Sequence, residues 1–265
     1  ADPDKSLPGD WLGIFALARV LYDERTAFWA AVVFATLPAV FFSSALISTD
    51  VPLLVFWTFA LYACVRWLDA PASERLTWAA ATGALIGLGF LAKYAMGYFA
   101  LCFALFALVE PEARRRLLSR DGLLAALAAL VVAAPNLIWN ATHSFATFTH
   151  TAANANWGGE LFNLDKLEDF AVAQVGIFGP ILMAALIWRL VASGHGTANP
   201  RRHADTMMLC FALPVLAVGL VQAFVSRANA NWAAPAYVAA TILVVAWLVR
   251  RARLWPLWIT VALHT

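Results

Sequence analysis

The stretch TWAAATGALIGLGFLAKYAMGYFALCFALFALV, from Thr77 to Val109, carries a single formal charge, Lys93, near its middle. One straight helix over this stretch would be about 50 Å long, whereas the hydrocarbon core of a bilayer is about 30 Å thick. Two shorter helices with Lys93 at the bend between them are the alternative. The choice between one helix and two decides whether this lysine lies within the membrane or at its surface. The location matters because a lysine in hydrocarbon costs several kcal/mol.

The composition is that of a membrane protein with several helical spans. Hydrophobic residues make up 63% of the 265 residues and charged residues 13%, against about 25% charged residues in soluble domains. The charges cluster in short breaks between apolar stretches, which suits helices because a helix satisfies its own backbone hydrogen bonds in lipid. Cys64, Cys102 and Cys210 lie in apolar stretches without metal-binding spacing, so we interpret them as small hydrophobic residues.

We predict an all-α polytopic membrane protein with about nine or ten transmembrane helices, short cytoplasmic loops and polar outer loops. Residues 1–265 would form one transmembrane domain. The predicted spans lie near residues 7–22, 27–47, 51–68, 77–92, 94–109, 122–139, 170–190, 206–225 and 235–249, with a partial span from residue 254. The abrupt start at Ala1 without an initiator methionine leads us to expect a fragment of a longer protein that lacks its N-terminal spans.

The basic residues assign the ends of these spans to the two sides of the membrane. One alternating set of breaks holds 14 of the 18 basic residues, and by the positive-inside rule this set is cytoplasmic. These residues are Arg19, Arg25, Arg66, Arg75, Arg114, Arg115, Arg116, Arg120, Arg189, Arg201, Arg202, Arg250, Arg251 and Arg253. Both ends of the Thr77–Val109 stretch then face the cytoplasm, so it is a hairpin with Lys93 at its outer apex. Gly83 and Gly87 predict a close helix contact on the first arm.

The same assignment places the segments with the most varied polar side chains on the outer face, where we expect any catalytic or binding site. It sends there the turn Ser48–Pro52, a loop at about residues 140–169, and the segment Ser226–Trp232. For Asp50 the alternatives are a helix N-cap or a carboxylate facing a cavity. For Lys93 they are a lysine that reaches the headgroups, a ligand for a lipid phosphate, or one half of a structural ion pair.

The outer loop mixes amide, imidazole and aromatic side chains. It contains Asn140, His143 and His150. The two histidines do not match the i, i+4 spacing of a helical zinc pair, so a metal site has little support, and surface histidines are the alternative. Asn140-Ala141-Thr142 also matches a glycosylation sequon, which alone is a weak signal.

The pentapeptide Ala-Asn-Ala-Asn-Trp occurs twice, at residues 153–157 and 228–232. Chance recurrence is one explanation in a chain rich in Ala and Trp. The alternative is carbohydrate binding, because Asn bonds hydroxyl groups in both directions and Trp stacks on sugar faces. Arg227, beside the second copy, adds a bidentate donor for anions.

Five segments, taken in order and spacing, resemble the C-type glycosyltransferase superfamily. The closest resemblance is to bacterial family 39 enzymes related to the protein O-mannosyltransferases and the lipid A aminoarabinose transferase. The segments are Ile47–Leu54, Gly87–Tyr94, Pro135–Asn140, Phe148–Thr151 with Asn154, and Ser226–Trp232, and the resemblance covers roughly residues 15–265.

The resemblance implies an inverting transferase in the bacterial inner membrane. It would move a sugar from a polyprenyl phosphate to a glycolipid (lipid A-like) or protein acceptor on the periplasmic face. It implies no role for nucleic acid and no certain cofactor, and it leaves a divalent metal open. Lys93 and Arg227 would bind the donor phosphate, and Asp50 would be a carboxylate at the cavity. The implied substrate-binding residues are Tyr94, Asn140, His143, His150, Asn154, Asn156, Trp157, Asn229, Asn231 and Trp232.

One departure from the family pattern concerns the catalytic base. The principal acidic residue of the family lies in the first outer loop, in an Asp-Glu-type motif. Asp2, Asp4 and Asp10 do not reproduce this motif, and Asp23-Glu24 is cytoplasmic by the charge assignment. We therefore expect the base to be absent from this chain and the chain to be inactive alone.

Two other classes compete with the transferase. A multi-span transporter also keeps isolated charges, although typically near the membrane midplane in interrupted helices. A non-catalytic subunit that binds lipid phosphate would share the phosphate ligands and also lack a base. The sequence does not identify the sugar.

Overall fold

The computed structural model describes residues 9–38, 40, 48–156, 161–191 and 201–265. Within these ranges the chain forms helices and no strand, which confirms the predicted all-α class. The α-helices are α1 (Gly9–Leu21), α2 (Glu24–Thr36), α4 (Asp50–Asp69), α5 (Arg75–Ala92), α6 (Gly97–Val109), α7 (Pro111–Leu117), α8 (Arg120–Thr142), α9 (Ala146–Ala155), α10 (Leu164–Phe178), α11 (Pro180–Val191), α12 (Arg202–Val225), α13 (Ala236–Arg250) and α14 (Trp255–His264). The 3-10 helices are η1 (Tyr94–Met96) and η3 (Ala230–Ala233).

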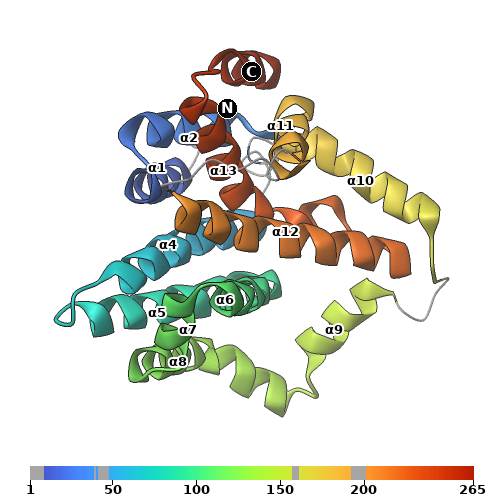
Figure 1. Ribbon diagram of the computed structural model, residues 1–265. Coiled ribbons are helices and arrows are strands. Elements are labelled where there is room, and N and C mark those ends of the chain that lie inside the picture. Colours follow the sequence, from blue (N-terminus) through green and yellow to red (C-terminus); the bar gives the residue numbers. More distant parts are fainter. Residues whose placement is uncertain (1–8, 39, 41–47, 157–160, 192–200) are drawn as a thin grey trace, which may run out of the picture.

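Helix α13 forms the centre of the molecule. Every residue from Ala236 to Leu248 is buried, and α1, α2, α11 and α12 pack around this helix (Figure 1). A helix that is apolar on all sides needs such a shell. Helices α4, α5 and α8 form a second packed group. The rings of Trp57, Phe99 and Phe211 meet edge to face and join α4, α6 and α12.

Fewer helices are long enough to cross a membrane than the sequence predicts. Within the described ranges, four helices have the required length and apolar character: α4, α5, α8 and α12. The pair α10 and α11 would make a fifth if it acted as one bent span. The stretches predicted at 7–22, 94–109 and 235–249 form helices of only 13, 13 and 15 residues. The stretch predicted at 27–47 falls partly outside the described residues.

The predicted span at 170–190 is not one straight helix. It is divided into α10 and α11, whose axes differ by 106°. Gly179 lies at the corner with a φ of 88°, in the left-handed region that favours glycine. A Cβ atom there would lie 2.3 Å from Nε2 of His264 on α14, so the corner also needs a residue without a side chain.

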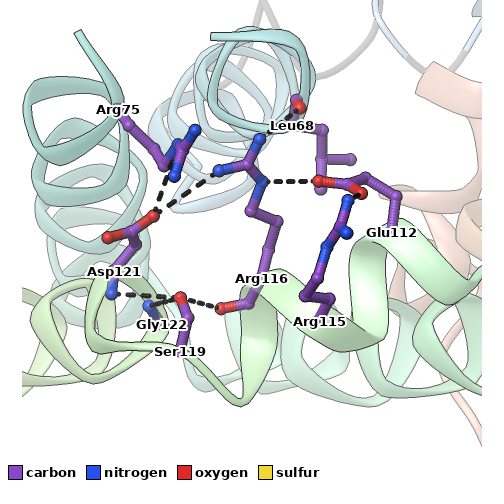
Figure 2. A network of polar contacts seen from close by, with 8 residues as sticks. All are labelled: Leu68, Arg75, Glu112, Arg115, Arg116, Ser119, Asp121 and Gly122. Carbon is purple, nitrogen blue, oxygen red and sulfur yellow. Dashed lines mark hydrogen bonds and ion pairs between the residues drawn. The ribbon is translucent and has the colours of Figure 1, made fainter. Parts of the chain in front are cut away.

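The Thr77–Val109 stretch forms two helices that meet at Lys93, as predicted. The Lys93 backbone is extended between α5 and η1, with φ −161° and ψ 136°. The first and last residues of the stretch lie near one another, at the polar network of Figure 2. Arg75 at the start of α5 pairs with Asp121 on α8 at 3.7 Å. Arg116, on the helix that follows α6, bonds the backbone oxygen of Leu68 at 3.3 Å.

A second charged network lies at this same end, which we call the basic end. Asp205 at the start of α12 is 2% exposed and is bonded by Arg189, Arg250 and the Tyr22 hydroxyl, at 2.8–3.1 Å. These partners come from the end of α11, the end of α13 and the α1–α2 turn. A hydrogen bond between His203 of α12 and Glu110, which precedes α7, connects this network with the first. Several of the polar segments between spans that the charge pattern assigns to one side of the membrane therefore lie close together in the structure.

The predicted loop at residues 140–169 contains a helix. Helix α8 continues to Thr142, and α9 follows after a short turn. No residue of α9 is buried, and in Figure 1 the helix stands apart from the main packed group, between α8 and α10. Phe145 and Asn156, at its two ends, have left-handed backbones with φ 55° and 53°. Apolar patterning could not reveal α9, because it buries no apolar face.

Helices α5 and α8 are in contact at the backbone level, as Gly83 and Gly87 predict. A Cβ atom at Gly83 would lie 2.0 Å from the backbone oxygen of Ala125, and one at Gly87 would lie 2.6 Å from Cβ of Val132. Small residues allow helices in a membrane to approach this closely.

Gly83→Ala is expected to separate α5 from α8 and to lower the unfolding temperature of the detergent-solubilised protein. The overpacking should cost about 1–3 kcal/mol of unfolding free energy. Gly97→Ala is the matched control, because a Cβ atom at Gly97 meets nothing within 4 Å. Equal unfolding temperatures for the two variants would contradict the close contact.

Candidate functional site

Asp50, Lys93 and Asn231, which are far apart in the sequence, form one cluster at the end of α4 opposite the basic end. The Lys93 ammonium lies 2.5 Å from Oδ1 of Asp50. The Asn231 side-chain amide donates to Oδ2 of Asp50 at 2.8 Å. Three predicted site residues are thus in direct contact, and they come from α4, the α5–η1 bend and η3.

The Asp50 carboxylate does not cap its own helix. Asp50 is the first residue of α4, and the residue at the N-cap position, Thr49, makes no side-chain capping bond. The Ser48 hydroxyl donates to Oδ2 of Asp50 at 2.9 Å and accepts from the Asp50 backbone N–H at 3.1 Å. Side chains therefore bind both carboxylate oxygens. The Asp50 carboxylate is thus bound by other side chains and does not cap its own helix, and the alternative of a carboxylate that faces a cavity stays a prediction.

The Lys93 side chain is paired but still reachable. Its exposed fraction is 23%, whereas that of the Asp50 side chain is 5%. Of the three alternatives for Lys93, the ion pair is the one that the structure contains. An ammonium group has three N–H donors, so a contact with one carboxylate oxygen leaves donors for an anion from the open side.

Tyr94, next to Lys93, is held by a second polar cluster. Its hydroxyl donates to Oδ1 of Asn136 at 2.9 Å and accepts from Nδ2 of Asn140 at 3.2 Å. The Asn140 side chain is 0% exposed, and its Oδ1 accepts the backbone N–H of Thr147 at the start of α9. Asn140, a predicted substrate-binding residue, thus lies in the frame around Tyr94 rather than at the surface.

The two Asn/Trp segments approach one another through the residues that flank them. The Ser226 hydroxyl donates to the backbone oxygen of Asn156 at 2.8 Å, and the Gln222 amide donates to that of Ala155 at 3.0 Å. Gln174 on α10 holds the second segment, because its amide bonds the Ala230 oxygen at 3.2 Å. The Tyr237 hydroxyl in turn donates to Gln174 at 2.6 Å.

The other predicted site residues lie around these clusters. His143 stacks on Trp139 with ring centroids 4.3 Å apart, and both rings are exposed. His150 and Asn154 are exposed on α9, Asn229 precedes η3, and Trp232 is half-buried. The Arg227 side chain is exposed. Trp157 lies outside the described residues.

Sequence reasoning missed five polar residues that hold the site: Ser48, Asn136, Gln174, Gln222 and Ser226. Asn136, Gln174 and Gln222 are lone amides in apolar helices, and this is the signal that could have found them, because an amide in such a helix needs a partner. Ser48 and Ser226 lie next to residues that the sequence singled out, but nothing in their type predicts their bonds.

Among the described residues, no group of three or more His, Cys, Asp or Glu side chains could hold a metal ion. A cavity of about 410 Å³ lies at the basic end, between α1, α4, α6, α7 and α12. Glu110, Arg201 and His203 are among its lining residues, so it is distinct from the Asp50–Lys93 cluster.

Comparison with known proteins identifies the class of protein to which this chain belongs. The family of dolichyl-phosphate-mannose-protein mannosyltransferases matches residues 11–139, the part of the chain that contains Asp50, Lys93, Tyr94 and Asn136. The chain is a member of the C-type glycosyltransferase superfamily, related to family 39.

A particular relative extends the match over more of the chain. The lipid A galacturonosyltransferase RgtD of Rhizobium johnstonii is 38% identical over 220 residues, which are 83% of this chain and 45% of the relative. The chain thus spans less than half the length of this relative. No solved structure matches the chain.

Asp50→Asn is expected to lower the unfolding temperature in detergent, because it leaves the Lys93 ammonium without its carboxylate. Losing a partner of a charged group costs about 2 kcal/mol. The double variant Asp50→Asn/Lys93→Met removes both charges and should recover most of the loss.

Asp169→Asn provides the matched control for this comparison. It breaks the Lys166–Asp169 pair on α10, whose side chains are 55% and 70% exposed, and exposed pairs contribute little. Equal effects of Asp50→Asn and Asp169→Asn on the unfolding temperature would show that the Asp50–Lys93 contact is not a buried, stabilising pair.

Proposed function

We propose that this chain is part of a membrane glycosyltransferase that transfers a sugar from a polyprenyl phosphate to a lipid A-like acceptor. The observation that carries the proposal is the Lys93–Asp50–Asn231 cluster, a partly open ammonium held by a buried carboxylate at one end of apolar helices. The match to a lipid A galacturonosyltransferase supports a glycolipid acceptor more than a protein acceptor.

In this proposal Lys93 binds the donor phosphate. The acceptor hydroxyl oxygen bonds to the anomeric carbon, the bond from that carbon to the phosphate oxygen breaks, and the hydroxyl proton passes to a general base. The polyprenyl phosphate leaves with one more negative charge than the donor diester carried. An ammonium at this position stabilises the leaving phosphate more than the donor, and this difference is what accelerates the transfer.

Asp50 then acts on Lys93 rather than on the acceptor. Both its oxygens are bonded, to Lys93 on one side and to Asn231 and Ser48 on the other. A carboxylate engaged in this way holds the ammonium in place. The general base for the acceptor hydroxyl is therefore a different group, as the sequence also predicts.

The name of the same relative suggests the class of sugar that is transferred. We propose a hexuronosyl donor, and a galacturonosyl polyprenyl phosphate is the first compound to assay. Such a sugar carries a carboxylate, and the exposed Arg227 guanidinium next to the segment that bears Asn231 is suited to bind a carboxylate or a phosphate. His143, His150 and Asn154 are exposed at α8 and α9 and are proposed to contact the acceptor.

Removal of the Lys93 charge should weaken recognition of phosphate. We expect Lys93→Met/Asp50→Asn in the full-length protein to bind a polyprenyl monophosphate about tenfold more weakly and to lower the transfer rate about a hundredfold. Binding of the uncharged polyprenol should not change. The readouts are titration of both lipids into the detergent-solubilised protein and transfer to lipid A in vesicles.

Lys166→Met, which removes an exposed lysine on α10, is the matched control. Unchanged binding of the polyprenyl monophosphate by Lys93→Met/Asp50→Asn would refute the role of Lys93. Weaker binding of lipid A phosphate, with the polyprenyl monophosphate unaffected, would assign Lys93 to the acceptor and refute a donor-phosphate site.

Accessibility distinguishes the transferase from a transporter. We expect Asn154→Cys on α9 to react with a membrane-impermeant maleimide on intact cells. Arg115→Cys at the basic end should react only after the membrane is permeabilised, because positive loops stay inside. A cysteine at position 93 that reacts from both sides would favour a carrier, and reaction of Arg115→Cys on intact cells would reverse the proposed orientation.

A further inference from the structure

Tyr94, Asn136 and Asn140 form a hub whose position fixes the neighbouring Lys93. Tyr94 follows Lys93 directly and begins η1, the short helix after the bend. The Tyr94 ring lies between Phe90 of α5, at a centroid distance of 4.7 Å, and Phe148 of α9, at 4.9 Å and nearly parallel. Its hydroxyl both donates and accepts within the hub. Contacts from three helices therefore determine where this side chain lies.

The hub is a hydrogen-bond network centred on the buried Asn140 amide. The Asn140 amide N–H groups lie near the Tyr94 hydroxyl at 3.2 Å, the Asn136 backbone oxygen at 2.9 Å and Oδ1 of Asn136 at 3.2 Å. Its carbonyl accepts the Thr147 backbone N–H at 3.1 Å. The Asn140 amide is thus buried with its donors and its acceptor in use, and a satisfied buried polar group of this kind makes a local structure rigid and unique.

The hub also orients α9. The N-cap residue Phe145 makes no side-chain capping bond, so the Asn140 side chain supplies an acceptor to an N–H in the first turn. Phe148, one residue further along the helix, stacks on Tyr94. The same small network thus sets both the bend that carries Lys93 and the helix that carries His150 and Asn154.

We propose that Tyr94, through Asn136 and Asn140, is a positioning residue for Lys93 and does not itself bind the phosphate. This inference rests on the proposed role of Lys93 as the donor-phosphate ligand. The aligned bonds keep the bend in one conformation, so that the ammonium is held at the Asp50 carboxylate and at the phosphate position at the same time. Losing the Tyr94 hydroxyl leaves the charge in place but allows the bend to move.

The test is a double-mutant cycle with a polyprenyl monophosphate as the probe and the uncharged polyprenol as the reference lipid. Tyr94→Phe keeps the ring contacts and removes only the hydroxyl. We expect it to weaken phosphate binding about fivefold, the loss that one net hydrogen bond corresponds to. In the Lys93→Met/Asp50→Asn background, Tyr94→Phe should have no further effect, because there is no ammonium left to position.

Tyr62→Phe is the matched control. It removes a tyrosine hydroxyl that accepts from Arg66 at 3.3 Å toward the basic end, so it should leave binding of both lipids unchanged. In the full-length protein, Tyr94→Phe should raise KM for the polyprenyl phosphate donor and leave KM for the lipid acceptor unchanged.

The outcomes separate this inference from the proposed function. If Lys93→Met/Asp50→Asn binds the phosphate as the unmodified protein does, the proposed function falls and the positioning role falls with it. If that variant binds weakly but Tyr94→Phe binds normally, only the positioning role is overturned. An equal fivefold loss from Tyr94→Phe in both backgrounds would show that Tyr94 acts independently of Lys93, which also overturns it.

Discussion

The contact between the Lys93 ammonium and the Asp50 carboxylate, at 2.5 Å, is the interaction on which the end of the structure opposite the basic end depends. It joins the start of α4 to the bend between α5 and α6. A charge of either sign alone in this surrounding would be costly, and the pair keeps the end of the helices neutral. Asn231 extends the contact to η3, so three segments that are distant in sequence are fixed by one carboxylate.

The two ends of the helices use charge in different ways. At the basic end, Asp205 is bonded by two arginines and a tyrosine hydroxyl, and its side chain is 3% exposed. Such a network fixes the ends of helices but offers little to a ligand. At the other end, the Lys93 side chain is 23% exposed, close to the 28% of Arg250 at the basic end, and it makes one contact with the Asp50 carboxylate. The donors already in use, rather than the exposure, distinguish the two ends: Arg250 places both terminal nitrogens on Asp205, whereas the single Lys93–Asp50 contact leaves N–H donors of the ammonium for an anion.

The sequence predicts those features that depend on local pattern and charge. The lone Lys93 and the arginines on both sides of the Thr77–Val109 stretch were sufficient to predict the bend, and Gly83 and Gly87 predicted the close helix contact. Asn231 could not be assigned to Asp50, because no local signal relates residues that are 181 positions apart. Helix α9 and the 106° corner at Gly179 were also missed. The first lacks an apolar face, and the second depends on how close His264 of α14 lies.

The repeated Ala-Asn-Ala-Asn-Trp segments show why a motif does not define a role. In the second copy, Asn231 bonds Asp50 through its side chain, whereas in the first copy the backbone oxygens of Ala155 and Asn156 accept bonds from Gln222 and Ser226. The two copies are therefore not two equivalent sugar sites. One supplies a side chain to the Asp50–Lys93 cluster, and the other is attached to the end of α12, which leaves the exposed side chain of Asn154 on α9. A donor phosphate at Lys93 and an acceptor along α9 would then be brought together by the Tyr94 hub, because that hub is in contact with both.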